Sequence, residues 1–286
     1  MILKSILSVV LSASISAACA AEIGYATLIS HRGESFDAPE NTLPAYKTAV
    51  ERGFGFECDI YLSADKRVFT FHDSNLSRTT CGAVTNACKD AKWETQISKV
   101  DVGSWGKWKG SRFQGTRPAL LEEVLGLARD GRWIYVEVKP GPEIVPYVKE
   151  IFARQTKATP KNVLFISFNK ASCRALKAQM PEYKVLWLTG WWDRNDRKNH
   201  SRSAEAEIAG AKEAHADGID ICFSSEIHDN AYIQRCATPG SNSTVGRSTP
   251  SRRPWRVSAT GRRRSPRTVR RSCSTIISPA CHGDFR

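Results

Sequence analysis

Carboxylates and an amine that could act on a phosphate ester recur at two-residue spacing in apolar segments. Glu57 and Asp59 lie in FGFECDIYL. Glu137 and Lys139 lie in YVEVKP. Because side chains alternate between the faces of a strand, the members of each pair share one face. FGFECDIYL is too apolar for an exposed edge strand, so its two carboxylates are expected to serve a buried site.

Two histidines follow other apolar segments, each within a polar motif. His31 and Arg32 begin HRGE, and His72 precedes Asp73 in FHD. Histidine titrates near neutral pH and can pass protons to and from a reacting group. The side chains of Arg32 and Lys139 can neutralise a phosphate. These residue types fit cleavage of a phosphodiester.

Three carboxylates held close together repel one another, and each raises the pKa of its neighbours. A divalent cation would remove this conflict, since oxygen ligands suit both Mg²⁺ and Ca²⁺. The sequence therefore predicts a metal site formed by Glu57, Asp59 and Glu137, and it leaves the choice between these two ions open.

The elements that would position these groups alternate between strand and helix, as in βαβ units around a parallel sheet. We expect strands over residues 27–30, 54–62, 68–72, 133–139, 163–168, 184–189 and 218–223. We expect helices over residues 43–52, 120–129, 143–154, 170–180 and 204–216. This order predicts an α/β fold of the TIM-type β/α barrel class, with an insertion at about 74–116. Catalytic groups of such barrels gather where the strands end.

The motifs, in their order and spacing, resemble the glycerophosphodiester phosphodiesterases. They are HRG followed after five residues by PENT, the E-x-D of FECDIYLS, FHDSNLSRTT and the E-x-K of YVEVKP. DVGSWGKW and FISF support the likeness, which covers about residues 26–236. The resemblance implies that glycerol 3-phosphate and an alcohol are the products. It implies these roles: Glu57, Asp59 and Glu137 as metal ligands, His31 and His72 as general acid and base, Arg32 and Lys139 as phosphate contacts.

Two other functions stay open. A phospholipase D-like barrel acting on lysolipids would need an apolar groove or a membrane-facing patch, and the sequence shows no clear amphipathic anchor. A catalytically impaired barrel could instead bind polyanions through a basic tail. If the chain is a glycerophosphodiester phosphodiesterase, its expected partner is a small glycerophosphodiester and not a nucleic acid.

The N-terminus predicts export. Residues 1–21 combine Lys4, an apolar run and a small-residue cleavage pattern ending in Ala20, as in a secretory signal peptide. No later stretch is long and apolar enough for a membrane span. We expect a secreted or periplasmic protein, with the barrel over residues 22–236. Oxidising compartments permit disulfides, so we expect Cys81 and Cys88 to close the loop CGAVTNAC.

Residues 237–286 differ from the rest of the chain in charge. They contain eleven Arg, no Lys and one acid, and they carry +10 of the net charge of +13. The remaining +3 excludes the body of the chain as a basic platform for nucleic acid. The segment also lacks the W-T-V strand and the T-x-x-P motif that the resemblance implies. The barrel is therefore expected to miss its eighth strand.

Codon structure suggests a cause for this aberrant tail. Joining the third base of each codon to the first two of the next, from Thr238-Pro239 to Ser248-Thr249, permits A-G-L-[EKQ]-[LF]-H-x-W-T-V-D. This pattern predicts a shifted reading frame. A tail read in the wrong frame has not been selected to pack on the barrel. We accordingly expect no strand from it between the first and the seventh strands.

Overall fold

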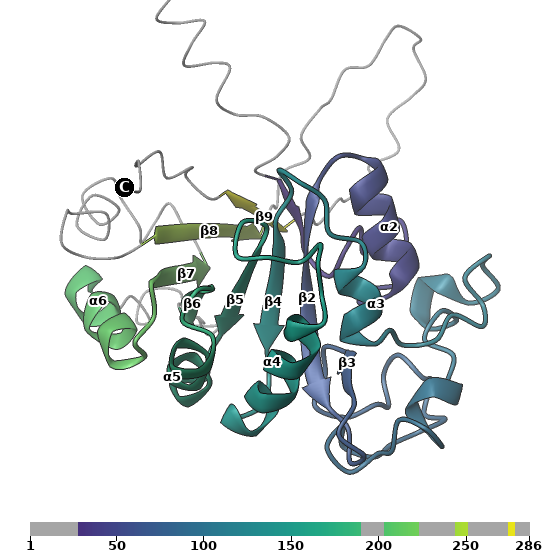
Figure 1. The fold of residues 1–286 in the computed structure, drawn as a ribbon. Helices are drawn as coiled ribbons and strands as arrows, with labels where there is room; N and C mark the ends of the chain where they lie inside the picture. The colour runs from purple at the N-terminus through teal and green to yellow at the C-terminus, as the bar shows by residue number, and fades with distance from the viewer. Residues whose placement is uncertain (1–27, 190–202, 223–243, 251–273, 278–286) are drawn as a thin grey trace, which may run out of the picture.

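The computed structural model describes residues 28–189, 203–222, 244–250 and 274–277. Its strands form one curled sheet, and the helices lie outside it (Figure 1). The strands are β1 (Ile29–Ser30), β2 (Gly55–Leu62), β3 (Val68–Thr70), β4 (Ile134–Val138), β5 (Val163–Ser167), β6 (Lys184–Thr189), β7 (Gly218–Cys222), β8 (Thr244–Pro250) and β9 (Ser274–Ile277). The α-helices are α2 (Leu43–Glu51), α3 (Leu121–Leu125), α4 (Val145–Ala153), α5 (Lys170–Gln179) and α6 (Ala204–Glu213).

Six strands between residues 29 and 222 form a parallel run in the sheet. β1 pairs with β2, β2 with β4, and β4, β5, β6 and β7 follow in order, all parallel. The result is a half-barrel with helices on its outer face, which confirms the predicted α/β class and its relation to the TIM barrel.

The third predicted strand is present but does not belong to the parallel set. β3 runs antiparallel to β2, with Thr70 opposite Ile60 and Val68 opposite Leu62. β2 extends past its pairing with β4, which ends at Ile60. β3 therefore returns along this overhang, and the chain after it arrives beside Asp59, whose carbonyl accepts the N–H of Phe71 at 3.0 Å. This hairpin brings His72 back to the point where β2 leaves the barrel.

The tail contributes two strands, so the expectation that none would pair between β1 and β7 is wrong. β8 pairs parallel to β7, and β9 pairs antiparallel to both β8 and β1. An open half-barrel leaves backbone groups unpaired on both edges, and any segment able to extend can satisfy them. The sequences TVGRSTP and STII contain several β-branched residues, which favour an extended backbone. The predicted signal peptide, residues 1–21, lies outside the described part of the chain, as do residues 251–273 and 278–286.

Alternation along the strands separates a core from the barrel interior. Outward side chains of β2, β4, β5, β6 and β7 pack with the helices into one large hydrophobic cluster that includes Cys58, Val136 and Phe165. Inward side chains of β1, β4, β5 and β6 form a smaller apolar cluster: Ile29, Tyr135, Leu164, Ile166 and Leu186. Polar inward positions on β2 and β4 stand out against this apolar interior.

The insertion has a hydrophobic core of its own beneath β3. Phe69 and Phe71 pack there with residues from the insertion, among them Trp93. Cys88 is buried in this cluster, whereas Cys81 is exposed, and both are free thiols. The predicted disulfide is thus wrong, because one sulfur packs inward near the carbonyl of Asp73 while the other faces the surface. Among the described residues, no helix has the length and apolarity needed to cross a membrane.

Candidate active site

The sheet register brings the three predicted metal ligands together. Asp59 on β2 lies opposite Glu137 on β4, and Glu57 points to the same interior face two residues before Asp59. Oxygens of the three carboxylates lie within 4.8 Å of one another, and all three residues are buried. Glu57 Oε1 and Asp59 Oδ1 make no hydrogen bond with any described residue. Buried carboxylate oxygens that lack a hydrogen bond can serve as ligands of a divalent cation.

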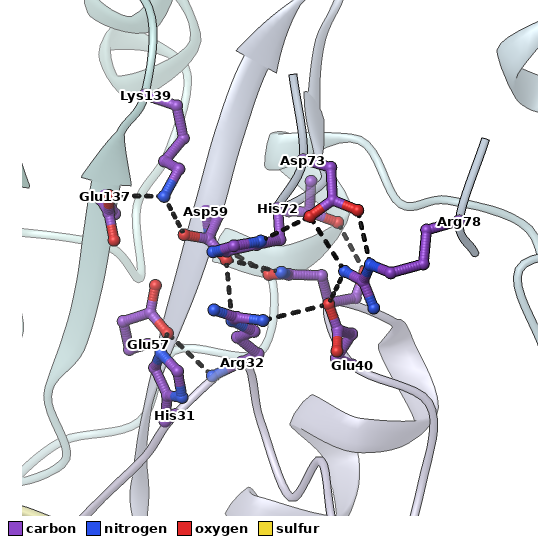
Figure 2. Close-up of polar contacts among 12 residues, drawn as sticks. His31, Arg32, Glu40, Glu57, Asp59, His72, Asp73, Arg78, Glu137 and Lys139 are labelled. Atoms are coloured by element: carbon purple, nitrogen blue, oxygen red, sulfur yellow. Dashed lines mark hydrogen bonds and ion pairs between the residues drawn. The ribbon is translucent and has the colours of Figure 1, made fainter. Parts of the chain in front are cut away.

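Lys139 lies just past the end of β4 and reaches back over the acids. Its Nζ donates to Glu137 Oε1 at 2.8 Å and lies 3.3 Å from Asp59 Oδ1 (Figure 2). Burial opposes the charge on this amine, but the attraction of Asp59 and Glu137 outweighs it and raises the pKa of Lys139. The amine therefore remains a cation at the centre of the acidic cluster.

The HRG motif forms a tight turn that faces the same cluster. Arg32 and Gly33 both have positive φ, of 58° and 71°. A Cβ on Gly33 would lie 2.7 Å from the carbonyl carbon of Ala45, so this position requires glycine. The turn aims the backbone N–H of Arg32 at Glu57 Oε2, 2.8 Å away, and it places Arg32 Nε 3.4 Å from Asp59 Oδ2.

His31 stands at the edge of the cluster, and 37% of its side chain is exposed. Its Nε2 lies 3.9 Å from Glu57 Oε2. Loss of solvation of the ring by the surrounding protein, together with repulsion from Arg32, lowers the pKa of His31 to about 4. His31 is thus a neutral imidazole near neutral pH, able to accept a proton.

His72 approaches from the β3 side. Its Nδ1 lies 2.8 Å from Asp73 Oδ1, and Arg78 from the insertion donates to the same carboxylate (Figure 2). Burial lowers the pKa of His72, partly offset by attraction to Asp59. All seven residues predicted as site residues therefore meet at one location, where β2 and β4 end.

Asn41 is a site residue that the sequence did not reveal. PENT directly precedes α2, whose N-cap is Thr42, and the Thr42 side chain makes no capping bond. Asn41 instead donates from Nδ2 to Asp59 Oδ2 at 2.7 Å and accepts the Asp59 N–H and the Tyr46 hydroxyl at Oδ1. It adopts a φ of 55°, a left-handed conformation that asparagine tolerates better than most residues. The position of Asn41 at a tight turn shortly after the HRG motif was the sequence signal that could have indicated its role in the site.

The acids do not share one charge state. Burial and the neighbouring carboxylates raise the pKa of Glu57 well above its usual value, and they raise that of Glu137 to about 8. Burial alone would also raise the pKa of Asp59, but ion pairs with Lys139 and Arg32 lower it instead. Without a further cation, only Asp59 has enough positive charge nearby to stay ionised. The donor set therefore fits a divalent cation, whose charge would let all three acids ionise.

Comparison with known proteins gives a consistent family. The model of the Glycerophosphoryl diester phosphodiesterase family matches residues 31–222. A glycerophosphodiester phosphodiesterase of Caldanaerobacter subterraneus is 35% identical over 162 residues, which cover 55% of this chain and 64% of that protein. A putative glycerophosphodiester phosphodiesterase of Bacillus subtilis is 36% identical over 125 residues, covering 43% and 49%. The chain thus spans less than two thirds of the length of these relatives.

A solved structure supports the fold. A phosphodiesterase from Oleispira antarctica, in complex with the product sn-glycerol-3-phosphate, superposes with a TM-score of 0.61 at 24% identity. The alignment covers 76% of this chain and 81% of that one. The family match spans the HRG turn, the three acids, both histidines and every strand from β2 to β7. This chain therefore belongs to the Glycerophosphoryl diester phosphodiesterase family.

Proposed function

We propose that this protein is a metal-dependent phosphodiesterase that cleaves glycerophosphodiesters to glycerol 3-phosphate and an alcohol. The observation that carries the proposal is the convergence of Glu57, Asp59 and Glu137, with two carboxylate oxygens lacking any hydrogen bond, beside two histidines and two cations. The Caldanaerobacter relative and the Oleispira structure, by their names, support the same reaction class.

The three acids would hold Mg²⁺ or Ca²⁺ through their inward oxygens. When bound, such an ion would supply positive charge that stabilises the phosphate as charge develops on it. Arg32 and Lys139 would add two fixed positive charges at the same place. Arg32 and Lys139 each form an ion pair with Asp59, so both charged groups already lie next to the predicted metal site. A phosphate bound at that metal would lie within their reach.

The histidines would move the protons. Cleavage breaks the bond between phosphorus and the alcohol oxygen, so this oxygen gains a proton while the attacking hydroxyl loses one. His31, on the HRG turn, lies beside Glu57, and His72, after β3, lies beside Asp59 (Figure 2). One histidine would serve the attacking group and the other the leaving group.

The described surface favours a small, polar substrate. Phe168 is the one large hydrophobic side chain that is exposed among the described residues, at 44%. An acyl chain of a lysolipid would need a broader apolar surface. We therefore propose a deacylated head-group diester, such as glycerophosphocholine, as the substrate class. Export and the binding of polyanions by the Arg-rich tail stay predictions from the sequence.

The test is hydrolysis of glycerophosphocholine by the purified chain, followed by ³¹P NMR, which separates diester from monoester. We expect glycerol 3-phosphate to accumulate. Its formation should stop when a chelator removes the metal ion and should resume on addition of Mg²⁺ or Ca²⁺. Turnover that persists in excess chelator would refute the metal role. A fully loaded, folded protein that leaves the diester intact would refute the activity.

A further inference from the structure

A chain of charged side chains links His72 to Arg32 around the rim of the site. Asp73 Oδ1 lies 2.8 Å from His72 Nδ1. Arg78 grips Asp73 with two nitrogens, Nε at 2.5 Å from Oδ2 and Nη2 at 3.1 Å from Oδ1. The same Nη2 donates to Glu40 Oε1 at 2.6 Å, and Arg32 Nη1 donates to this oxygen at 3.2 Å. Figure 2 shows these contacts as a continuous band.

Ionisation of Asp73 decides which ring nitrogen of His72 carries the proton. Burial opposes the negative charge, but hydrogen bonds from Arg78 and His72 outweigh it and lower the pKa of Asp73. A carboxylate can only accept hydrogen bonds, so the neutral ring must donate from Nδ1. Nε2 is then the nitrogen without a proton and the one able to take one from a reacting group.

Arg78 is held in its own place from two sides. Its guanidinium stacks over the ring of Trp105, with Cζ 4.9 Å from the ring centroid. Glu40, in the loop before α2, accepts a hydrogen bond from Nη2 of the same guanidinium. Because 40% of the Arg78 side chain is exposed, these ion pairs contribute little to folding stability. Their planar, two-pronged geometry instead restricts the orientation of the Asp73 carboxylate.

We propose that Asp73 and Arg78 are positioning residues, which hold His72 as the Nδ1–H tautomer with Nε2 available for proton transfer, and that Glu40 ties this clamp to Arg32. The inference rests on the proposed phosphodiesterase function. It also gives the insertion a task, since Trp105 and Arg78 both come from it. The insertion fixes the orientation of an acid/base group that lies at the end of a neighbouring strand.

The informative variant is Asp73→Asn. Arg78 presents only donors, so it will draw the amide oxygen toward itself and turn the NH₂ group toward His72. The ring must then accept at Nδ1 and carry its proton on Nε2, the wrong tautomer for a base. Loss of the correct tautomer in a comparable histidine–aspartate pair lowers kcat about 10⁴-fold. Here we expect a loss of roughly 10²–10⁴-fold in kcat, the usual worth of a general acid or base, with KM nearly unchanged.

The experiment is a long-range ¹H–¹⁵N correlation spectrum of the full chain labelled with [¹⁵N]histidine, with the signal assigned by His72→Gln. Slightly above neutral pH, wild type should show His72 as Nδ1–H, and Asp73→Asn should show Nε2–H. Arg78→Lys should give a mixture of both tautomers and an intermediate kcat. Arg117→Lys is the matched control, since Arg117 forms a similar two-pronged pair with Glu123 away from the site.

Several outcomes would overturn the proposal. One is a wild-type His72 protonated on Nε2. Another is an Asp73→Asn variant with unchanged tautomer and turnover. A rise in KM alone for Arg78→Lys would make Arg78 a substrate contact and not a positioning residue. The spectrum needs neither metal nor substrate, so a clamp that fails can be told from a phosphodiesterase assignment that fails.

Discussion

Two buried acidic sites lie in the same barrel interior, separated by β5 and β6. The first, on β2 and β4, gathers Glu57, Asp59 and Glu137 around two cations and an asparagine. The second, on β7, is Asp220 alone, 1% exposed and without a hydrogen-bond partner among the described residues. Since Ile219 and Ile221 pack outward, Asp220 faces the interior between them.

The pKa values of the two buried aspartates, Asp220 and Asp59, shift in opposite directions. Burial raises the pKa of Asp220 to about 7, and no charged side chain among the described residues counters it. Asp59 is buried just as deeply, yet Lys139 and Arg32 lower its pKa. The difference shows that burial by itself neutralises a carboxyl group, and that a charged buried acid needs cations placed beside it. Only the first site is equipped to present ionised oxygens to a metal.

The largest effect expected from this comparison is on turnover. His31→Ala or His72→Ala should each lower kcat roughly 10²–10⁴-fold, since both flank the first site and carry its protons. Asp220→Asn, at the second site, should leave kcat near wild type. The readout is the steady-state rate of glycerophosphocholine hydrolysis. A histidine variant with normal turnover would show that its ring is structural.

The next effect concerns stability and pH. The pKa of Asp220 is raised in the folded protein, so its carboxyl stays protonated after the unfolded chain has ionised. Folding then binds a proton between about pH 4 and about pH 7, and stability falls as pH rises through that window. Replacing Asp220 with Asn removes this loss. From about pH 5 to about pH 8, the free energy of unfolding of wild type should fall by about 3 kcal/mol relative to that of Asp220→Asn.

Urea unfolding at the two pH values measures that difference, and the titration of all other groups cancels between the two proteins. A wild-type minus variant difference that does not change with pH would mean that Asp220 has a partner that keeps it ionised. The two acidic sites would then be less different than the described residues indicate.

A smaller effect is expected at Asn41, which orients Asp59. Asn41→Ala removes a donor to Oδ2 and an acceptor of the Asp59 N–H. Loss of such a supporting contact typically weakens metal affinity 10–100-fold. Titration with Ca²⁺ followed by calorimetry measures the change, with Asn162→Ala as the control, since the Asn162 side chain bonds to Thr159 and Lys157 in its own loop. Equal affinity in wild type and Asn41→Ala would remove Asn41 from the site.

Much of this arrangement followed from the sequence. The alternation in FGFECDIYL and YVEVKP predicted strands with inward acids that converge, and the structure brings them together with Asp59 opposite Glu137. Local pattern could not give the direction of β3, because an antiparallel hairpin and a parallel strand have the same hydrophobic alternation. Asn41 was missed because its bonds depend on a strand far along the chain. The disulfide between Cys81 and Cys88 was predicted from their short separation in the sequence. The structure buries Cys88 and exposes Cys81, so the two sulfurs do not meet.

The tail shows another limit of sequence reasoning. The Arg-rich tail as a whole gave no reason to expect strands, although TVGRSTP and STII contain β-branched residues. The unpaired edges of β1 and β7 are matched by β9 and β8 through backbone bonds, which do not depend on side-chain identity. The codon pattern behind the predicted frame shift belongs to the gene, and resequencing codons 230–286 would decide it.

Calorimetric titration tests most directly whether the acids of β2 and β4 form a divalent metal site. Wild type should bind one Mg²⁺ or Ca²⁺ per chain. Glu137→Gln should abolish this binding while keeping a cooperative unfolding transition, and Asp220→Asn should bind as wild type does. Glu150→Gln, on the exposed face of α4, controls for loss of one negative charge. Binding that survives Glu137→Gln, or that disappears in Asp220→Asn, would contradict the account.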